Sequence, residues 1–340
     1  MTKSEDTIQL AHGSGGLMMQ KLLGDLIFRE FGNEILAQHS DSAILQIGGS
    51  QLAFTTDSFV IDPVFFPGGD IGKLAVCGTV NDLAVCGAIP LYLSVAFIIE
   101  EGFPLKDFET IVRSLALEAK KAGVRIVTGD TKVVNKGKCD KVFINTSGIG
   151  RFREDGRTLG GTATITPGDK IILSGTIGDH GMAILNARES FQFRSSLVSD
   201  CSCLNFLIHS VFDAGFQLKF MRDPTRGGVA AVLNELASEI PYGIEINEDS
   251  IPLNPRVRAM TELLGFDPLS VANEGKVVMI VPETDAQAIL KTLQSNESGK
   301  DAAIIGVISN ERPHKVILNT FSGGKRLIDV PAGVLLPRIC

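Results

Sequence analysis

An apolar segment with one acid in its middle limits most strongly how this chain can fold. Residues 70–87, DIGKLAVCGTVNDLAVCG, follow a glycine pair, repeat small apolar side chains at helical spacing and end at a glycine. They predict a helix with Asn81 and Asp82 in its interior. A carboxylate there has no helix end to cap, and an unpaired buried carboxylate is costly. Asp82 therefore indicates a ligand or a buried partner.

The remaining apolar segments are mixed strands and helices. In the first half, strands are predicted at 51–61, 91–100, 124–134 and 141–150, with a helix between Pro104 and Gly123. In the second half, strands are predicted at 170–175, 277–282 and 303–309, and helices at 203–214, 226–239, 255–264 and 284–295. Because no regular βαβ rhythm appears, we expect an α+β fold in layers and not a Rossmann sheet.

Residues 151–168 are polar and glycine-rich with weak periodicity, which indicates a boundary. We expect an N-terminal domain over 1–155 and a C-terminal domain over 156–328. Residues 329–340 have no period and include two prolines, so they predict a flexible extended tail that carries Cys340.

Charge and composition exclude several classes of protein. The 340 residues include 32 Lys and Arg against 39 Asp and Glu, a formal net charge of −7, which argues against nucleic acid as the main partner. The N-terminus lacks the apolar core of a signal peptide, and the apolar stretches are too short to span a bilayer. The six scattered cysteines are typical of cytosolic thiols. We therefore expect a cytoplasmic protein without a membrane or nucleic-acid partner.

Four further aspartates accompany apolar sequence. Asp57 and Asp130 are predicted to end strands, Asp41 precedes an apolar run, and Asp223 opens the turn DPTRGG. For any one of them, an Asx turn or helix cap is the commoner explanation. Taken together with Asp82, they favour Mg²⁺, because carboxylate oxygens suit this ion and it often bridges carboxylates to nucleotide phosphates.

A glycine cluster precedes the first predicted helix. The loop HGSGG contains Gly13, Gly15 and Gly16, and its successive backbone N–H groups fit a phosphate. A flexible linker is an equally good explanation. The loop is not a P-loop, since no Gly-Lys-Ser/Thr follows, and no G-x-G-x-x-G opens a βαβ unit.

Three other features carry less specific signals. Lys132 is typical of a solvated lysine at a strand end, and Glu274 of an acid on the surface. The pair Cys201 and Cys203 in CSC lacks a second ligand pair for a metal, so ordinary thiols are the better interpretation. Cys340 places a thiol at the chain end, and alone it would be read as an incidental exposed thiol.

Several motifs together resemble a known family. The segment TTDSFVIDPVFFPGGDIGKLAVCGTVNDLAVCGAIPLYLS, with GDTKVV, RDPTRGG, NEG and the final PRIC, is similar to the HypE family of hydrogenase maturation proteins. The resemblance runs nearly end to end. The wider superfamily of aminoimidazole ribonucleotide (AIR) synthetase, selenophosphate synthetase and thiamine-monophosphate kinase is similar too, and it shares the strand-end TTD, the helical ND, the GDT and the DPTRGG-type turn.

The resemblance implies a two-domain AIR synthetase-like (PurM-like) fold, with an N-terminal sheet that pairs across a homodimer and with ATP and Mg²⁺ between the domains. By position, the implied metal ligands are Asp41, Asp57, Asp82 and Asp223. The implied ATP-binding residues are Gly13, Gly15, Gly16, Lys73, Asn81, Gly129, Asp130 and Thr131. The implied catalytic residues are Cys340, Lys132 and Glu274.

The resemblance also implies a reaction. Members of the family receive a carbamoyl group on the terminal thiol and dehydrate it with ATP to a thiocyanate, the source of the cyanide ligands of [NiFe]-hydrogenase iron. The implied partners are a HypF-type carbamoyltransferase and a HypC–HypD complex that accepts the cyanide. Alternatives are a selenophosphate synthetase, a thiamine-monophosphate kinase and a non-enzymatic, ATP-regulated thiol carrier. The glycine loop lacks the reactive residues of the first, and the second has no use for Cys340.

Overall fold

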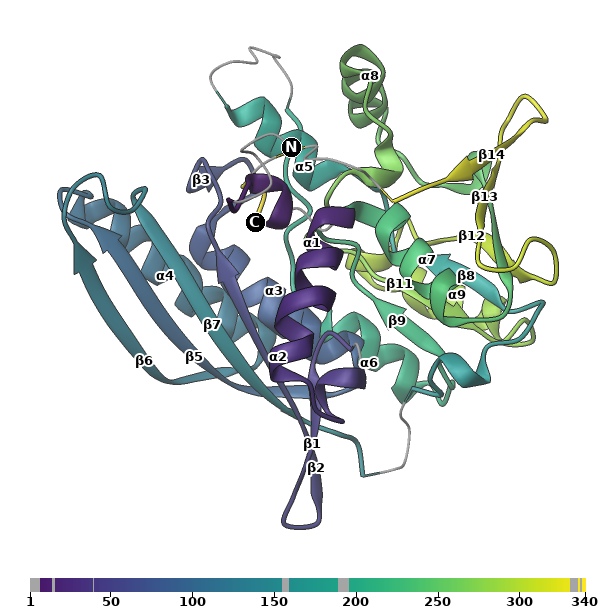
Figure 1. The fold of residues 1–340 in the computed structure, drawn as a ribbon, viewed down its shortest axis with the longest axis horizontal. Coiled ribbons are helices and arrows are strands. Elements are labelled where there is room, and N and C mark those ends of the chain that lie inside the picture. The colour runs from purple at the N-terminus through teal and green to yellow at the C-terminus, as the bar shows by residue number, and fades with distance from the viewer. Residues whose placement is uncertain are drawn as a thin grey trace.

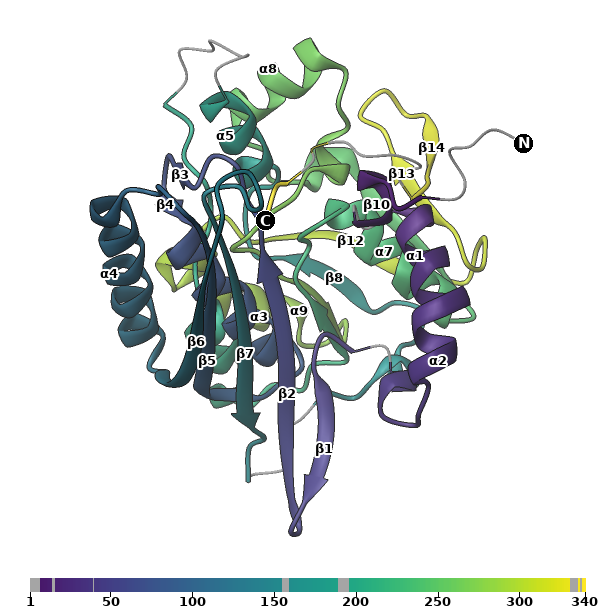
Figure 2. The same cartoon turned by 60° about the vertical axis from the view of Figure 1, so that its left-hand side comes forward.

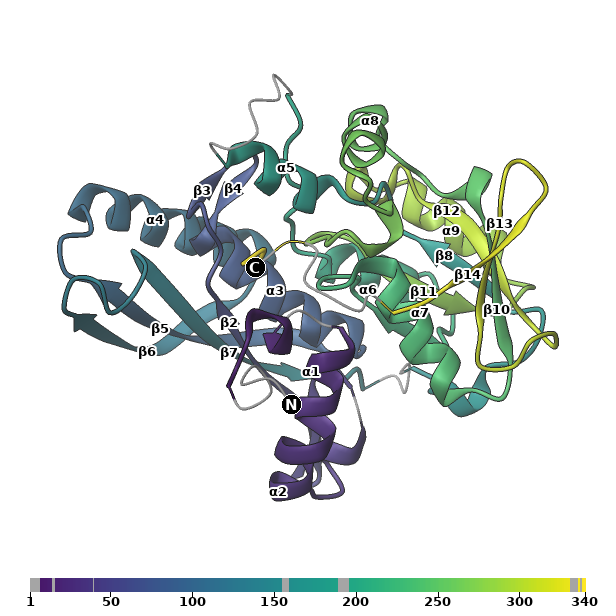
Figure 3. The ribbon, with the colours of Figure 1, turned by 45° about the horizontal axis from the view of Figure 1, so that its top comes forward.

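A computed structural model describes residues 7–13, 16–38, 40–154, 159–188, 196–330, 336 and 338–340 (Figure 1). Gly15 and the predicted boundary between residues 155 and 156 lie outside this part of the chain. The described residues form two large sheets that lie side by side, each with its own helices, and a small two-stranded sheet of β3 and β4. The C-terminus lies at the junction of the two halves and not at the periphery (Figure 3).

The N-terminal half is built on a five-stranded sheet of order β1-β2-β7-β5-β6. Helices α3 and α4 cover one face, and side chains of the opposite face are exposed along β2 and β7. A helical stretch, α1 and α2 with a π-helical turn between them, precedes the sheet (Figure 2). The elements are α1 (Leu17–Leu22), α2 (Arg29–Phe31), β1 (Ala43–Ile47), β2 (Ser50–Phe59), β3 (Phe65–Phe66), β4 (Gly69–Asp70), α3 (Ile71–Val85), β5 (Ile89–Glu100), α4 (Leu105–Ala122), β6 (Arg125–Val134) and β7 (Val142–Arg151).

Helix α3 is the apolar helix expected from the sequence, and its packing requires a small residue. The Asp70 carboxylate caps its N-terminus, accepting from Gly72 N–H at 2.7 Å and Lys73 N–H at 3.1 Å. A Cβ at Gly78 would lie 2.8 Å from the Phe59 ring, so only glycine lets α3 lie this close to β2. This approach brings the middle of α3 to the carboxyl end of β2.

The C-terminal half is a seven-stranded sheet of order β14-β13-β10-β12-β8-β11-β9. In β8, Ile171 and Leu173 pack with α7 on one face, and Ile172 packs with α6 and α9 on the other. Ala84 and Val85 of α3 join this second core, so one helix serves both halves. The elements are β8 (Lys170–Leu173), α5 (Asp179–Ala187), α6 (Asn205–Asp213), β9 (Phe220–Arg222), α7 (Gly228–Glu239), β10 (Gly243–Asn247), α8 (Pro255–Leu264), β11 (Val278–Val281), α9 (Ala286–Gln294), β12 (Ala303–Ser309), β13 (Val316–Asn319) and β14 (Lys325–Ile328).

The mixed-layer fold class is confirmed: most strand pairs are antiparallel, and β5–β6 and β10–β13 are parallel. Each predicted segment contains the expected element, whereas β1, β9, β10, β13, β14 and α5 were not predicted. Two placements were wrong, because β2 continues to Phe59 and β6 to Val134, so that Asp57 and Asp130 lie inside strands and do not end them. Among the described residues, no helix is both long and apolar enough to cross a membrane.

Replacing Asp70 should destabilise the N-terminal half. Asp70→Ala leaves two N–H groups of α3 without their acceptor, and loss of such a cap costs about 1 kcal/mol of unfolding free energy. Asp70→Ser restores an acceptor and should recover most of the loss. Denaturant unfolding measures both, and equal stability of Asp70→Ala and the parent would contradict this role.

Candidate active site between the two halves

Four aspartates from separate elements share one site. Asp82 lies on α3, Asp57 on β2, Asp41 just before β1, and Asp223 just after β9. Burial raises the pKa of Asp82 well above its ordinary value, and the like charges of Asp223, Asp57 and Asp41 raise it further. The structure therefore brings together the four predicted metal ligands, three from the first sheet region and one from the second.

Hydrogen bonds hold the acids in place. The Thr55 hydroxyl lies 2.8 Å from Asp82 Oδ2 and 3.0 Å from the carbonyl oxygen of Asp41. Arg222 forms ion pairs with Asp41 at 3.3 Å and with Glu235 at 2.8 Å. Arg222 thus offsets one of the four carboxylates and connects the β9 turn to the N-terminal half.

The donor set suits a hard divalent cation. Burial raises the pKa of Asp223 to about 8, with a further contribution from Asp41, and burial also raises the pKa of Asp57 and Asp41. Carboxylate oxygens from four elements come together here, and a divalent cation would offset the negative charge that burial disfavours. The residues therefore fit Mg²⁺.

A cleft of about 440 Å³ opens beside Asp41, between the two halves. Asp41 and Arg222 line it together with apolar side chains, which are Ile44, Val85, Phe152, Leu159, Phe220 and Met221. Apolar walls with a few charged groups at one end are typical of a small-molecule site.

The chain end docks against the same region as a short extended segment. The Val60 N–H donates to the backbone oxygen of Cys340 at 3.0 Å, and the Asp62 N–H donates to the Arg338 carbonyl at 3.3 Å. The Ile339 side chain is buried in the N-terminal core. The last residues, 338–340, are therefore held against the N-terminal core, with Ile339 buried and Cys340 half-buried, and the predicted flexibility of residues 329–340 stays a prediction.

Two residues that the sequence did not single out hold this segment by its carbonyls. His180 is fully buried, and its Nε2 donates to the Ile339 carbonyl at 2.7 Å, while Nδ1 pairs with the Ser199 hydroxyl at 2.8 Å. Arg188 donates to the carbonyls of Asp62 at 3.0 Å and Arg338 at 3.1 Å. Because these contacts use backbone atoms, no side-chain motif in the tail could have revealed them.

The docked thiol faces Glu274, Asp57 and Arg226. Burial raises the pKa of Cys340 to about 12; the Arg226 charge opposes this, and Glu274 and Asp57 add to it. Burial also raises the pKa of Glu274 well above its ordinary value, with Cys201 and Asp223 contributing. Glu274 is only 3% exposed, and its Oε1 has no hydrogen-bond partner among the described residues. The surface interpretation of Glu274 was wrong.

The remaining predicted residues fall into two groups. Gly13 lies near the site, since Arg226 donates to its carbonyl at 2.7 Å, and Gly16 begins α1. Asn81 uses its amide to join the halves: Nδ2 donates to the Ser202 carbonyl at 3.1 Å and Oδ1 accepts from the Leu204 N–H at 2.8 Å.

Lys73 donates to the Gly68 carbonyl at 2.9 Å and so supports the loop before α3.

The second group lies on the exposed edge strand β6 and consists of Gly129, Asp130, Thr131 and Lys132. Within it, Lys132 pairs with Asp130 at 2.7 Å. Strands β7 and β5 separate β6 from β2, so these residues lie about 14 Å from the Asp57 strand at ordinary strand spacing.

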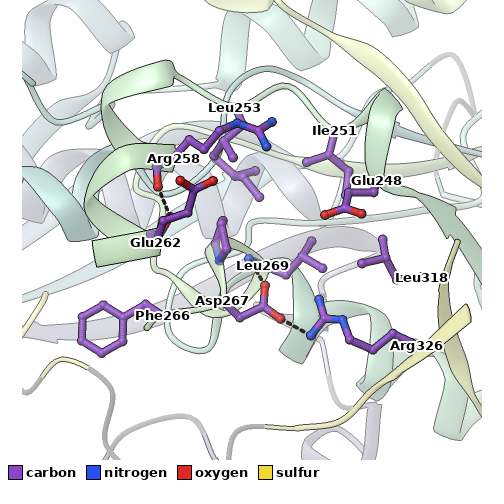
Figure 4. Close-up of a pocket in the computed structure, with 13 residues that line it drawn as sticks. Glu248, Ile251, Leu253, Arg258, Glu262, Phe266, Asp267, Leu269, Leu318 and Arg326 are labelled. Atoms are coloured by element: carbon purple, nitrogen blue, oxygen red, sulfur yellow. Dashed lines mark hydrogen bonds and ion pairs between the residues drawn. The ribbon is translucent and has the colours of Figure 1, made fainter. Parts of the chain in front are cut away.

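A separate pocket of about 170 Å³ lies in the C-terminal half, bordered by α8 and β14 (Figure 4). Asp267 and Arg326 form an ion pair of 2.7 Å at its wall. None of the predicted site residues lines this pocket. The acids, the cleft and the chain end therefore define the candidate site.

The fold is that of a two-domain AIR synthase-type protein. Family models for the N-terminal and C-terminal domains of AIR synthase related proteins match residues 39–152 and 166–319. The chain is 49% identical over 340 residues to carbamoyl dehydratase HypE of Escherichia coli K12, covering 98% of this chain and 100% of that protein. It is 47% identical over 334 residues to HypE of Rhizobium leguminosarum bv. viciae, covering 98% and 95%. The chain belongs to the HypE family.

Solved structures agree with this assignment. A HypE–HypF complex contains a chain with a TM-score of 0.86 and 49% identity, covering 91% of this chain and 99% of that one. HypE in complex with ATP has a TM-score of 0.81 and 43% identity, covering 98% and 100%. Thiamine monophosphate kinase from Aquifex aeolicus, at 17% identity and a TM-score of 0.65, is similar in fold alone.

The acid cluster should make stability fall as pH rises. The folded chain keeps the Asp223 proton up to about pH 8, whereas the unfolded chain releases it near pH 4. Between these values the folded state binds more protons, so the free energy of unfolding decreases with pH. Asp223→Asn should flatten this slope and raise the melting temperature at pH 8 without Mg²⁺. Melting curves at pH 5 and pH 8 measure it, and an unchanged slope would contradict the clustering.

Loss of Arg188 should release the chain end. Arg188→Ala removes two hydrogen bonds that hold the docked segment, so iodoacetamide should alkylate Cys340 at least about tenfold faster, an effect of about 1.4 kcal/mol on the docked state. Mass spectrometry of the C-terminal peptide measures the rate. Arg113→Ala, which removes an exposed helix pair, is the control. Equal alkylation rates in both variants would show that Arg188 does not hold the tail.

Proposed function

We propose that this protein is an ATP-dependent carbamoyl dehydratase that acts on its own C-terminal cysteine during hydrogenase maturation. The S-carbamoyl group on Cys340 would lose water and become a thiocyanate. The observation that carries this proposal is the position of the Cys340 thiol, docked beside Glu274, Arg226 and Asp57, which is one of the four clustered aspartates. Membership in the HypE family supports it.

The acidic and basic residues of the site have different roles in this proposal. Asp41, Asp57, Asp82 and Asp223 would hold Mg²⁺, which supplies charge neutralisation at the phosphates when bound. The cleft beside Asp41 would take the nucleotide, with Gly13 and Gly16 in the loop over its phosphates. Arg226 is the cation nearest the thiol and would orient the phosphoryl group toward the carbamoyl oxygen.

Glu274 has the stronger case as the proton acceptor. Its burial raises its pKa, which makes the carboxylate a better base for an amide N–H. Its free Oε1 has an open hydrogen-bonding position beside the thiol. Lys132 would contribute only from the exposed edge of the sheet, where it pairs with Asp130.

The docked state of the chain end explains why the carbamoyl group must be attached to Cys340 outside this site. At a pKa of about 12 the Cys340 thiol stays protonated at neutral pH, and a thiol is a poor nucleophile compared with its thiolate. The site tolerates an uncharged sulfur, as in the carbamoyl adduct. We propose that residues 329–340 undock to reach a HypF-type carbamoyltransferase in the cytoplasm, and later a HypC–HypD complex that accepts the cyanide.

The exposed sheet supports a homodimer. All but one of the β6 residues are exposed, and an apolar hollow lined by Phe97, Val112, Ile126 and Val127 separates β6 from α4. A second copy on this face would cover these side chains. It would also enclose Gly129, Asp130 and Thr131, the predicted nucleotide residues that one chain leaves in solvent.

Asp82→Asn should abolish ATP-dependent conversion and leave the fold intact, because it removes charge and not volume. The S-carbamoyl adduct of the parent should lose the mass of one water when ATP and Mg²⁺ are added. The adduct of Asp82→Asn should keep its mass, and Asp249→Asn, an exposed acid on the C-terminal half, should behave like the parent. Intact-protein mass spectrometry measures this.

Two outcomes would contradict the proposal. An adduct of constant mass in the parent would favour a passive thiol carrier. ATP turnover that survives in Cys340→Ala would favour a kinase of the same superfamily.

A further inference from the structure

Two thiols and a carboxylate converge at the seam between the halves, and a third thiol, Cys201, lies beside one of them. The sequence motif CSC offers Cys201 and Cys203 without a second ligand pair, and the fold supplies that pair. Cys77 comes from α3 and Glu118 from α4, while CSC lies in the loop before α6. The ligand atoms of Cys77, Glu118 and Cys203 all lie within 4.8 Å of one another.

The distances match a tetrahedral metal site. Zn–S bonds of about 2.3 Å place two sulfur ligands about 3.8 Å apart along a tetrahedral edge. The Sγ atoms of Cys77 and Cys203 are 3.6 Å apart, and Cys77 Sγ is 3.9 Å from Glu118 Oε1. Cys201 is buried against the same thiol, and together with Cys203 it raises the pKa of Cys77 after burial does.

The surroundings orient the carboxylate. Lys121 pairs with Glu118 Oε2 at 3.1 Å, which leaves Oε1 directed at the Cys77 thiol. Such an outer partner commonly fixes a metal ligand. Cys77 and Glu118 are buried, whereas Cys203 is partly exposed and leaves a route for an ion.

We propose that Cys77, Cys201, Cys203 and Glu118 bind one zinc ion that joins the two halves of the molecule. Each thiol that becomes a ligand releases one proton to solvent. Three thiolates and one carboxylate around Zn²⁺ leave a net charge of −2, which Lys121 partly offsets. The site uses neither the terminal thiol nor the four aspartates, so zinc binding can be measured separately from the dehydratase reaction, although Cys201 lies near Glu274.

The zinc would stiffen a loop that supports the active site. The residue before CSC, Asp200, accepts from the Glu274 N–H at 3.1 Å and pairs with Lys276 at 3.2 Å. Asn81 holds the same loop at the Ser202 carbonyl. Fixing Cys201 and Cys203 would therefore fix the backbone of Glu274 relative to α3.

Metal binding to the reduced, chelator-treated full-length protein tests the proposal. The parent should take up one equivalent of Zn²⁺ in competition with a chromophoric chelator. With Co²⁺ it should show thiolate-to-cobalt charge-transfer absorption and tetrahedral d–d bands. Cys203→Ser and Cys77→Ser should lose these bands and bind zinc at least about tenfold more weakly. Cys139→Ser and Cys340→Ser, which change thiols outside the cluster, should bind like the parent.

A second measurement guards against misfolding of the buried variant. In the parent, zinc should slow the alkylation of the Cys203 peptide and leave the Cys139 peptide unaffected. Co²⁺ spectra without charge-transfer bands, unchanged zinc affinity in Cys203→Ser, or equal alkylation of Cys203 with and without zinc would each overturn the proposal.

Discussion

The desolvation of four clustered carboxylates, increased by their like charges, is the constraint on which the rest of this structure depends. Asp41, Asp57 and Asp82 come from the first half and Asp223 from the second; burial raises the pKa of all four, and like charges raise those of Asp82 and Asp223 further. A protein tolerates such a cluster only when a cation or a bound ligand compensates it at work. A cation that binds between the two halves would therefore be stabilised by these carboxylates.

The two halves are held together at the seam by amide, ion-pair and apolar contacts. The amide of Asn81 bonds the loop before α6, Arg222 connects β9 to Asp41, and α3 contributes to the hydrophobic cores of both halves. These polar and apolar contacts keep the four acids close together and add no further negative charge. The thiol cluster of Cys77 and its neighbours lies on this same seam.

Backbone and side-chain contacts together position the chain end. Val60, Asp62, His180 and Arg188 bind backbone atoms of residues 338–340. The Arg338 guanidinium donates to the Val60 carbonyl at 2.9 Å and pairs with Asp140, and Ile339 is buried in the core. Backbone capture sets the register of the last residue, so the thiol meets Glu274 and Arg226. A chemical change on the sulfur leaves those contacts intact.

The sequence by itself determined the layered fold class, the apolar helix around Asp82 and the importance of the acids, because apolar periodicity and a mid-helix charge are local properties. It also carried the resemblance to the HypE family. Only the tertiary structure decided that Glu274 is buried, that Asp130 and Lys132 lie on an exposed edge strand, and that His180, Arg188 and Arg226 surround the chain end. These facts depend on contacts between residues far apart in the chain, and burial and electrostatic coupling arise only when the two halves meet.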